Sequence, residues 1–180
     1  MIHNTLHIAY SIRKKLDPSL TLEEYKDYFN GNIHERIAAS QKSKSKEDTS
    51  KEFFSLQEKE FEGLKIEEEI KAELVKIKKK YGLFIISSNQ EKALQIYFRN
   101  NNLKGMFTEI LGVETHKSKE EKFKRLMSKY VLDQNNCLFV TDTLGDILEA
   151  KKIGLKTIAV DFGFHERKRL ERGKPFKIIS

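Results

Sequence analysis

The stretch from Asn136 to Asp161 constrains the fold more than any other part of the chain. Its apolar run, Cys137–Val140, ends at Asp142, and a second acid, Asp146, follows just before a helical pattern begins. Another apolar run comes directly after that helix. The pattern predicts a strand–helix–strand unit that places two carboxylates at the carboxyl end of a buried strand, where open α/β sheets bind their ligands.

The two acids predict a metal site. Asp142 and Asp146 are four residues apart at the strand-to-helix junction, so their side chains can converge on one point. Two hard oxygen ligands without a neighbouring Cys or His suit Mg²⁺, which keeps water or phosphate oxygens in its other positions. The alternative is structural: Asp142 or Thr143 caps the helix, and Asp146 is solvated.

The acid pair, the segment DILEAKKIGLKTIAV and the tail DFGFHERKRLERGKPFKIIS together resemble the last third of haloacid dehalogenase-like hydrolases. The similarity is close over roughly residues 82–180 and looser over 2–65. Thr141 departs from the family pattern, which often has Gly before the acid, but this backbone neighbour is not expected to be a ligand. The resemblance implies a Rossmann-like parallel α/β sheet with helices on both faces and an inserted α-helical cap. It also implies a phosphatase similar to phosphoglycolate phosphatases, with Mg²⁺ on Asp142 and Asp146.

The resemblance also implies two parts, a helical cap over 1–65 and an α/β core over 66–180. Within the cap, helical spacing covers 4–16, 21–29, 33–39 and 51–63, and the polar stretch 40–50 predicts a loop. Thr21 and Glu24 form a capping box. In the core, helices are expected at 67–80, 91–100 and 120–130 and strands at 83–86 and 107–111, an alternation typical of parallel sheets. The apolar face of 67–80 is expected to pack on the sheet.

Two further site residues follow from the resemblance. Ser88, in LFIISSNQ, matches the Ser or Thr that binds a phosphoryl oxygen at a strand end, although it could instead cap the next helix. The family also needs a lysine before the acid pair, and HKSKEEKF offers Lys117 and Lys119. Lys117 is preferred because it stands further ahead of Phe123, but the register leaves both open.

One family feature is missing. The nucleophile of these enzymes is an aspartate in an Asp-x-Asp-Gly pattern that ends an early strand, and this sequence does not contain the pattern. The opening MIHNTLHIAYSI resembles the segment that family members carry directly after that pattern. In the family that strand lies between the strands ending here at Ser88 and Asp142, so these two should face an empty slot with unpaired backbone groups. We therefore expect a truncated gene product that is inactive or nearly so.

Composition leaves two other function classes open. The net charge of +7 is compatible with nucleic-acid binding, but no basic–aromatic motif or known module supports it. A non-catalytic relative could instead bind a phosphorylated ligand or a protein in the same crevice. Cys137, the single cysteine, excludes an intramolecular disulfide and is expected to be a buried structural thiol. No stretch resembles a signal peptide or a membrane span of ~20 apolar residues, so we expect a cytoplasmic protein. The resemblance implies a small phosphorylated metabolite as its partner.

Overall fold

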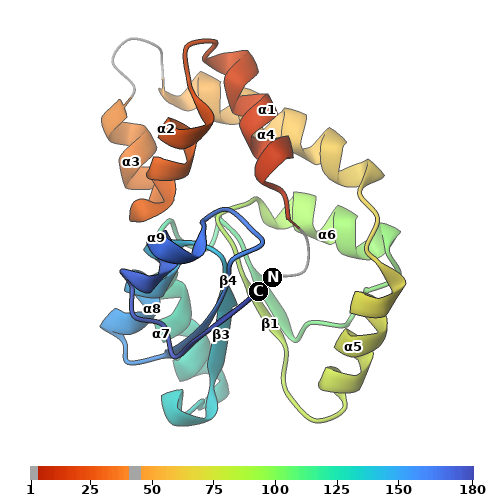
Figure 1. Ribbon diagram of the computed structural model, residues 1–180. Coiled ribbons are helices and arrows are strands. Elements are labelled where there is room, and N and C mark those ends of the chain that lie inside the picture. Colours follow the sequence, from red (N-terminus) through yellow and green to blue (C-terminus); the bar gives the residue numbers. More distant parts are fainter. Residues whose placement is uncertain (1–3, 41–45) are drawn as a thin grey trace.

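The computed structural model describes residues 4–40 and 46–180. Helices from the first part of the chain form a layer above the strands (Figure 1). In chain order they are α1 (Leu6–Leu16), α2 (Leu22–Asp27), the 3₁₀ turn η1 (Tyr28–Asn30), α3 (Ile33–Ser40) and α4 (Lys46–Gly63). We call this layer the cap.

The rest of the chain alternates helices and strands, as the sequence predicts. The elements are α5 (Glu68–Lys78), β1 (Phe84–Ile86), α6 (Glu91–Asn100), β2 (Glu109–Leu111), α7 (Lys119–Tyr130), the 3₁₀ turn η2 (Gln134–Asn136), β3 (Leu138–Thr141), α8 (Leu144–Lys152), β4 (Lys156–Val160), α9 (Arg167–Glu171) and β5 (Lys177–Ile179). Every strand pair is parallel. The predicted Rossmann-like α/β fold, with helices flanking its sheets, is therefore confirmed (Figure 1).

Local sequence signals explain where these helices begin and end. The predicted capping box is present, because the Thr21 hydroxyl accepts from the Glu24 amide at 3.2 Å and the Glu24 carboxylate accepts from the Thr21 amide at 2.8 Å. Thr143 caps α8 with a single hydrogen bond, because its hydroxyl accepts from the Asp146 amide at 3.3 Å. Gly154 follows α8 with φ +71°, a left-handed conformation that favours glycine.

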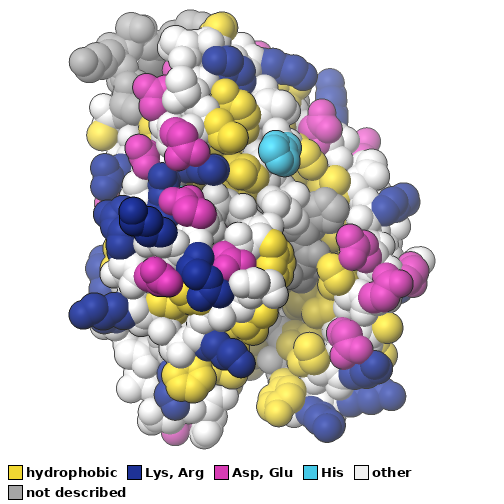
Figure 2. Space-filling view, in the orientation of Figure 1, with side chains coloured by type: hydrophobic (Ala, Val, Ile, Leu, Met, Phe, Trp, Pro, Cys, Tyr) yellow, Lys and Arg dark blue, Asp and Glu magenta, His cyan; other side chains and the backbone are white. Residues whose placement is uncertain are grey.

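The sheet is divided between β1 and β3. Among the described residues β1 pairs only with β2, and β3 pairs only with β4. A cavity of about 1500 Å³ is lined by residues of both β1 and β3, and Figure 2 shows the hollow with hydrophobic side chains on its walls. Leu138 and Val140 of β3 line it and are 59% and 43% exposed. The prediction of a buried strand is therefore wrong for these two side chains, because no strand in the described ranges pairs with the free edge of β3.

Hydrophobic packing is divided as well. One cluster lies inside the cap and includes Tyr25 and Phe53, with Phe164 entering it from the loop after β4. A second joins α4 to α6 around Phe61 and Tyr97. Separate clusters lie around β3, β4 and α8. The cap thus shares apolar contacts with the loop after β4 and with α6, which lie on the two sides of the divided sheet, and in the part of the chain that the structure describes the two halves of the sheet do not pair with each other.

Three details differ from the sequence predictions. The loop expected at 40–50 is helical from Lys46, because its Lys and Glu residues are good helix formers; residues 41–45 lie outside the described part. The helix α5 has no fully buried residue: Ile70 and Leu74 are partly buried against the cluster around α6, which Ile85 of β1 also joins, and with Ile77 they line the cavity, so its expected packing on the sheet is only partial. Cys137 is only half-buried. No helix in the described ranges has the length and apolar character needed to span a bilayer.

Candidate active site

Asp142 lies where β3 ends, at the edge of the cavity. Its Oδ2 accepts a hydrogen bond from the Phe164 amide at 2.9 Å, and its carbonyl accepts from the His165 amide at 3.1 Å. Burial raises the pKa of Asp142, the Phe164 amide opposes the rise, and the charge of Asp146 adds to it. The backbone around Gly163 comes so close that a Cβ there would lie 2.2 Å from Asp142 Oδ2.

Asp146 lies in the first turn of α8 and faces a lysine. Its Oδ2 accepts from Lys119 Nζ at 2.5 Å and from the Thr141 hydroxyl at 2.6 Å. Thr141 is therefore more than a backbone neighbour, which the sequence analysis missed. Lys117 lines the same cavity, and its carbonyl accepts from Asn32 at 3.1 Å. The ion pairs among the described residues include Lys119–Asp146 but none from Lys117, so the geometry favours Lys119 of the two lysines.

Ser88 lies in the loop after β1 and also lines the cavity. It does not occupy the cap position of α6, which belongs to Gln90. The next residue, Asn89, donates its amide to Ser87 Oγ and accepts from Gln57 of α4, both at 3.1 Å. A contact between cap and core therefore fixes the loop that carries Ser88.

Two buried charged residues were missed from sequence. Lys122 is 0% exposed, and its Nζ donates to the carbonyls of Ser87 and Gly112 at 2.5 and 2.9 Å, which ties the ends of β1 and β2 together. Burial lowers the pKa of Lys122 to about 8. One oxygen of the Glu149 carboxylate accepts from the Ser118 hydroxyl, the Lys119 amide and Asn32. The spacing of Lys119, Lys122, Phe123 and Leu126 on one helical face was the signal available.

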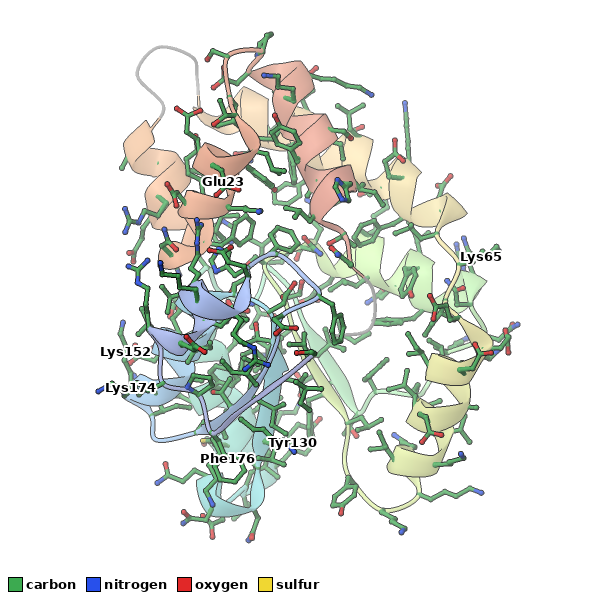
Figure 3. All side chains as sticks on the ribbon, in the orientation of Figure 1. Glu23, Lys65, Tyr130, Lys152, Lys174 and Phe176 are labelled. Carbon is green, nitrogen blue, oxygen red and sulfur yellow. The ribbon has the colours of Figure 1, made fainter. Side chains whose placement is uncertain are left out.

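The cap is held directly over the acid pair. His165 is fully buried; its Nδ1 accepts from the Leu144 amide and its Nε2 faces the Lys26 carbonyl, both at 3.0 Å, so the ring is neutral and protonated on Nε2. Burial lowers the pKa of His165 accordingly. Arg169 of α9 pairs with Glu23 and Asp27 of α2 at 3.2 and 3.0 Å; Figure 3 labels Glu23 on the cap side of this contact.

The donor set fits Mg²⁺. The described residues contain no group of three or more His, Cys, Asp or Glu side chains able to hold a metal, which leaves Asp142 and Asp146 as a pair. Both acids line one cavity, and the charge of Asp146 acts on Asp142. Mg²⁺ is commonly held by one or two carboxylates while water and phosphate oxygens complete its octahedron, whereas a closed structural metal site needs more ligands.

The sequence matches the family of haloacid dehalogenase-like hydrolases over residues 2–160. It is 25% identical over 93 residues to the phosphoglycolate phosphatase of Synechococcus elongatus, and that stretch covers 52% of this chain and 44% of the cyanobacterial one. The fold is similar to that of a hydrolase from Pseudomonas syringae, with a TM-score of 0.79, 14% identity and coverage of 98% and 86% of the two chains. It is also similar to a predicted phosphoglycolate phosphatase from Haemophilus somnus, with a TM-score of 0.69, 18% identity and coverage of 96% and 85%. The family match spans most of the sequence and the fold agrees with it, so this chain belongs to the haloacid dehalogenase-like hydrolases.

Proposed function

We propose that the chain is the larger part of a cytoplasmic, Mg²⁺-dependent phosphatase that acts on a small phosphate monoester. One observation carries the proposal: Asp142, Asp146 and Lys119 meet at the carboxyl ends of parallel strands, beside a cavity that Ser88 also lines. Open α/β sheets bind ligands at this edge. Phosphoryl transfer requires a positioned nucleophile, a metal and donors that neutralise the phosphoryl charge; in this proposal the two acids would hold the metal and Ser88 and Lys119 would be the donors, so that the nucleophile is still needed.

Each residue has a role in this proposal. Asp142 and Asp146 hold Mg²⁺, which neutralises phosphoryl charge when bound. Ser88 donates its hydroxyl to a phosphoryl oxygen. Lys119 pairs with Asp146 in the structure and is placed to donate to the phosphoryl group as well. The proposal takes Lys119 in preference to Lys117, because Lys119 lies against the acid pair.

The nucleophile belongs, we infer, on a strand outside these 180 residues. The unpaired edges of β1 and β3 face one cavity and support a parallel strand between them. The start of the cap supports the same position, because Asn4 donates to the Phe162 carbonyl at 3.0 Å and Thr5 lines the cavity. A strand leading into Thr5 would end beside Asp142, where an Asp-x-Asp pair is required. Without it the chain should be inactive or nearly so.

The test is restoration of activity. An apolar strand ending in Asp-x-Asp-Gly is fused before Met1, and hydrolysis of p-nitrophenyl phosphate is measured with and without Mg²⁺. The matched control carries Asn at both acid positions of the added strand, so that its folding is preserved. We expect turnover only from the Asp-x-Asp fusion, and its loss on Asp142→Asn.

Two results would contradict the proposal. Turnover by the 180-residue chain itself, abolished by Asp142→Asn, would show that no further strand is needed. A fusion that melts at a higher temperature than the chain alone, yet hydrolyses nothing, would point to a non-catalytic protein that binds a phosphorylated ligand in the same crevice.

A further inference from the structure

Glu149 of α8 is a buried carboxylate that lies at the start of α7. The residue is 7% exposed, and its Oε1 accepts hydrogen bonds from the Ser118 hydroxyl, the Lys119 amide and the Asn32 side-chain amide at 3.0, 2.9 and 3.2 Å. A buried carboxylate is costly unless donors satisfy it. The ion pairs within residues 4–40 and 46–180 do not include Glu149, so these three donors, two of them at the amino end of a helix, stabilise it.

Lys119 is attached to α8 at both of its ends. Its backbone amide donates to Glu149, and its Nζ donates to Asp146 Oδ2 at 2.5 Å. The two acids are three residues apart on α8, and side chains with this spacing lie on one face of a helix. The contact with Glu149 therefore fixes where the Lys119 side chain begins, and the contact with Asp146 fixes where it ends.

The third donor to Glu149 comes from the cap. Asn32 directly precedes α3, and its Oδ1 accepts from two backbone amides of the first turn of that helix at 3.0 and 3.3 Å. Its amide group donates to Glu149 and also to the Lys117 carbonyl at 3.1 Å. The Asn32 side chain is thus held at both of its polar atoms, and it joins the start of α3 to the segment that carries Lys119.

We propose that Glu149 is a positioning residue for Lys119 and that Asn32 makes this position depend on the cap. The attachment is a property of the fold, whereas its use in phosphoryl transfer rests on the proposed function, in which Lys119 donates to the phosphoryl group. A lysine side chain is long and flexible. Holding its ammonium group in place before a ligand arrives lowers the entropy cost of binding. Loss of either Glu149 or the Asn32 contact should therefore loosen Lys119.

The experiment measures the acetylation rate of individual lysines in the 180-residue chain, with sulfo-NHS acetate as the reagent and mass spectrometry to map the sites. Two other lysines serve as internal references. Lys117 is exposed and reports the activity of the reagent. Lys122 lies one turn further along α7 and is 0% exposed, so it becomes reactive only if the helix opens.

Three variants separate the contacts. Glu149→Met removes the acceptor, and Glu149→Gln keeps an acceptor oxygen without the charge. Asn32→Asp keeps the oxygen that caps α3 but replaces the donor with a second carboxylate, which Glu149 repels. The matched control is Glu121→Met, which removes an exposed carboxylate from the first turn of α7.

In the wild-type chain Lys119 should react more slowly than the exposed reference, because its ammonium group is buried and paired with Asp146. Glu149→Met should raise the labelling rate of Lys119 roughly 10- to 100-fold, as loss of a hydrogen bond to a charged group allows, and Asn32→Asp should raise it roughly 10-fold. Glu149→Gln should restore most of the protection that Glu149→Met loses. Lys122 should stay unreactive throughout, and the control should match wild type.

Two results would overturn the inference. If Lys119 stays protected in Glu149→Met and in Asn32→Asp, neither residue positions it. If Lys122 becomes as reactive as Lys119 in these variants, Glu149 only supports the folding of α7.

The proposed function is tested separately by adding inorganic phosphate with Mg²⁺, which should slow the labelling of Lys119 in Glu149→Met. Release of Lys119 in the variants without any effect of phosphate would count against Lys119 as a phosphoryl donor while confirming its positioning by Glu149. Protection by phosphate in a wild-type chain and variants that all label Lys119 alike would refute the positioning and support the proposed function.

Discussion

Gly145→Ala should separate the cap from the helix that carries Asp146. A Cβ at Gly145 would lie 2.2 Å from the Gly31 carbonyl oxygen, 2.7 Å from its carbonyl carbon and 2.9 Å from the Phe29 carbonyl oxygen. All three are backbone atoms, so no side chain can turn aside to make room. Ordinary carbon contacts need about 3.5 Å, so the loop after η1 must retreat by about 1 Å.

The expected loss follows from that displacement. Overpacking by one carbon in a tight contact typically costs about 1–3 kcal/mol. In a chain of this length 1 kcal/mol corresponds to about 2–4 °C, so Gly145→Ala should melt roughly 2–12 °C below wild type. The melting temperature is measured by circular dichroism without added ligand.

Gly63→Ala is the matched control for this prediction. Gly63 ends α4, its φ is not in the left-handed region, and a Cβ there would meet nothing within 4 Å. This substitution should be neutral or stabilise by about 0.4–1 kcal/mol, because alanine reduces the freedom of the unfolded chain. If the melting temperature of Gly145→Ala is no lower than those of Gly63→Ala and the wild type, the cap is not in close contact with α8 and the prediction is refuted.

Two further predictions concern the buried groups around the site. The pKa of Lys122 is lowered to about 8 in the folded protein, against 10.5 in the unfolded chain, so between these pH values the folded state binds fewer protons than the unfolded state. The free energy of unfolding should therefore rise by about 3 kcal/mol between pH 8 and 10.5 because of this residue. Urea unfolding at pH 7.5 and 10.5 tests this, and an equal rise in Lys122→Met would disprove it. Gly163→Ala would place a Cβ 2.2 Å from Asp142 Oδ2 and displace a proposed metal ligand. In the strand-completed fusion it should weaken Mg²⁺ binding about 10- to 100-fold by calorimetry, and unchanged affinity would argue against Asp142 as a ligand.

Periodic and capping patterns were enough to predict most of the fold. The helix predicted at 91–100 coincides with α6, and the helix predicted at 120–130 differs from α7 by one residue, because apolar spacing and flanking polar residues are local signals. The absence of the Asp-x-Asp-Gly pattern also predicted where the sheet is divided. It was not used to predict that Leu138 and Val140 would be exposed. Local patterns describe which residues prefer burial, and they cannot show that the element meant to cover them is missing.

The candidate site was less predictable than the fold. Asp142 and Asp146 are close in sequence, so their proximity could be inferred from one junction. The choice between Lys117 and Lys119 depended on how α7 is rotated against α8, which is a tertiary property. Lys122, Glu149 and Arg13 look like surface charges in the sequence, and only their packing identifies them as buried.

The unpaired strands on either side of the cavity also affect solubility. Edges with free N–H and C=O groups and apolar side chains are templates for association between chains, and β3 presents such an edge with Leu138 and Val140 exposed. The net charge of +7 opposes association by repulsion between molecules. Salt screens that repulsion while leaving the edges unchanged. The chain alone should therefore aggregate as ionic strength rises, and a strand that fills the slot should keep it in solution.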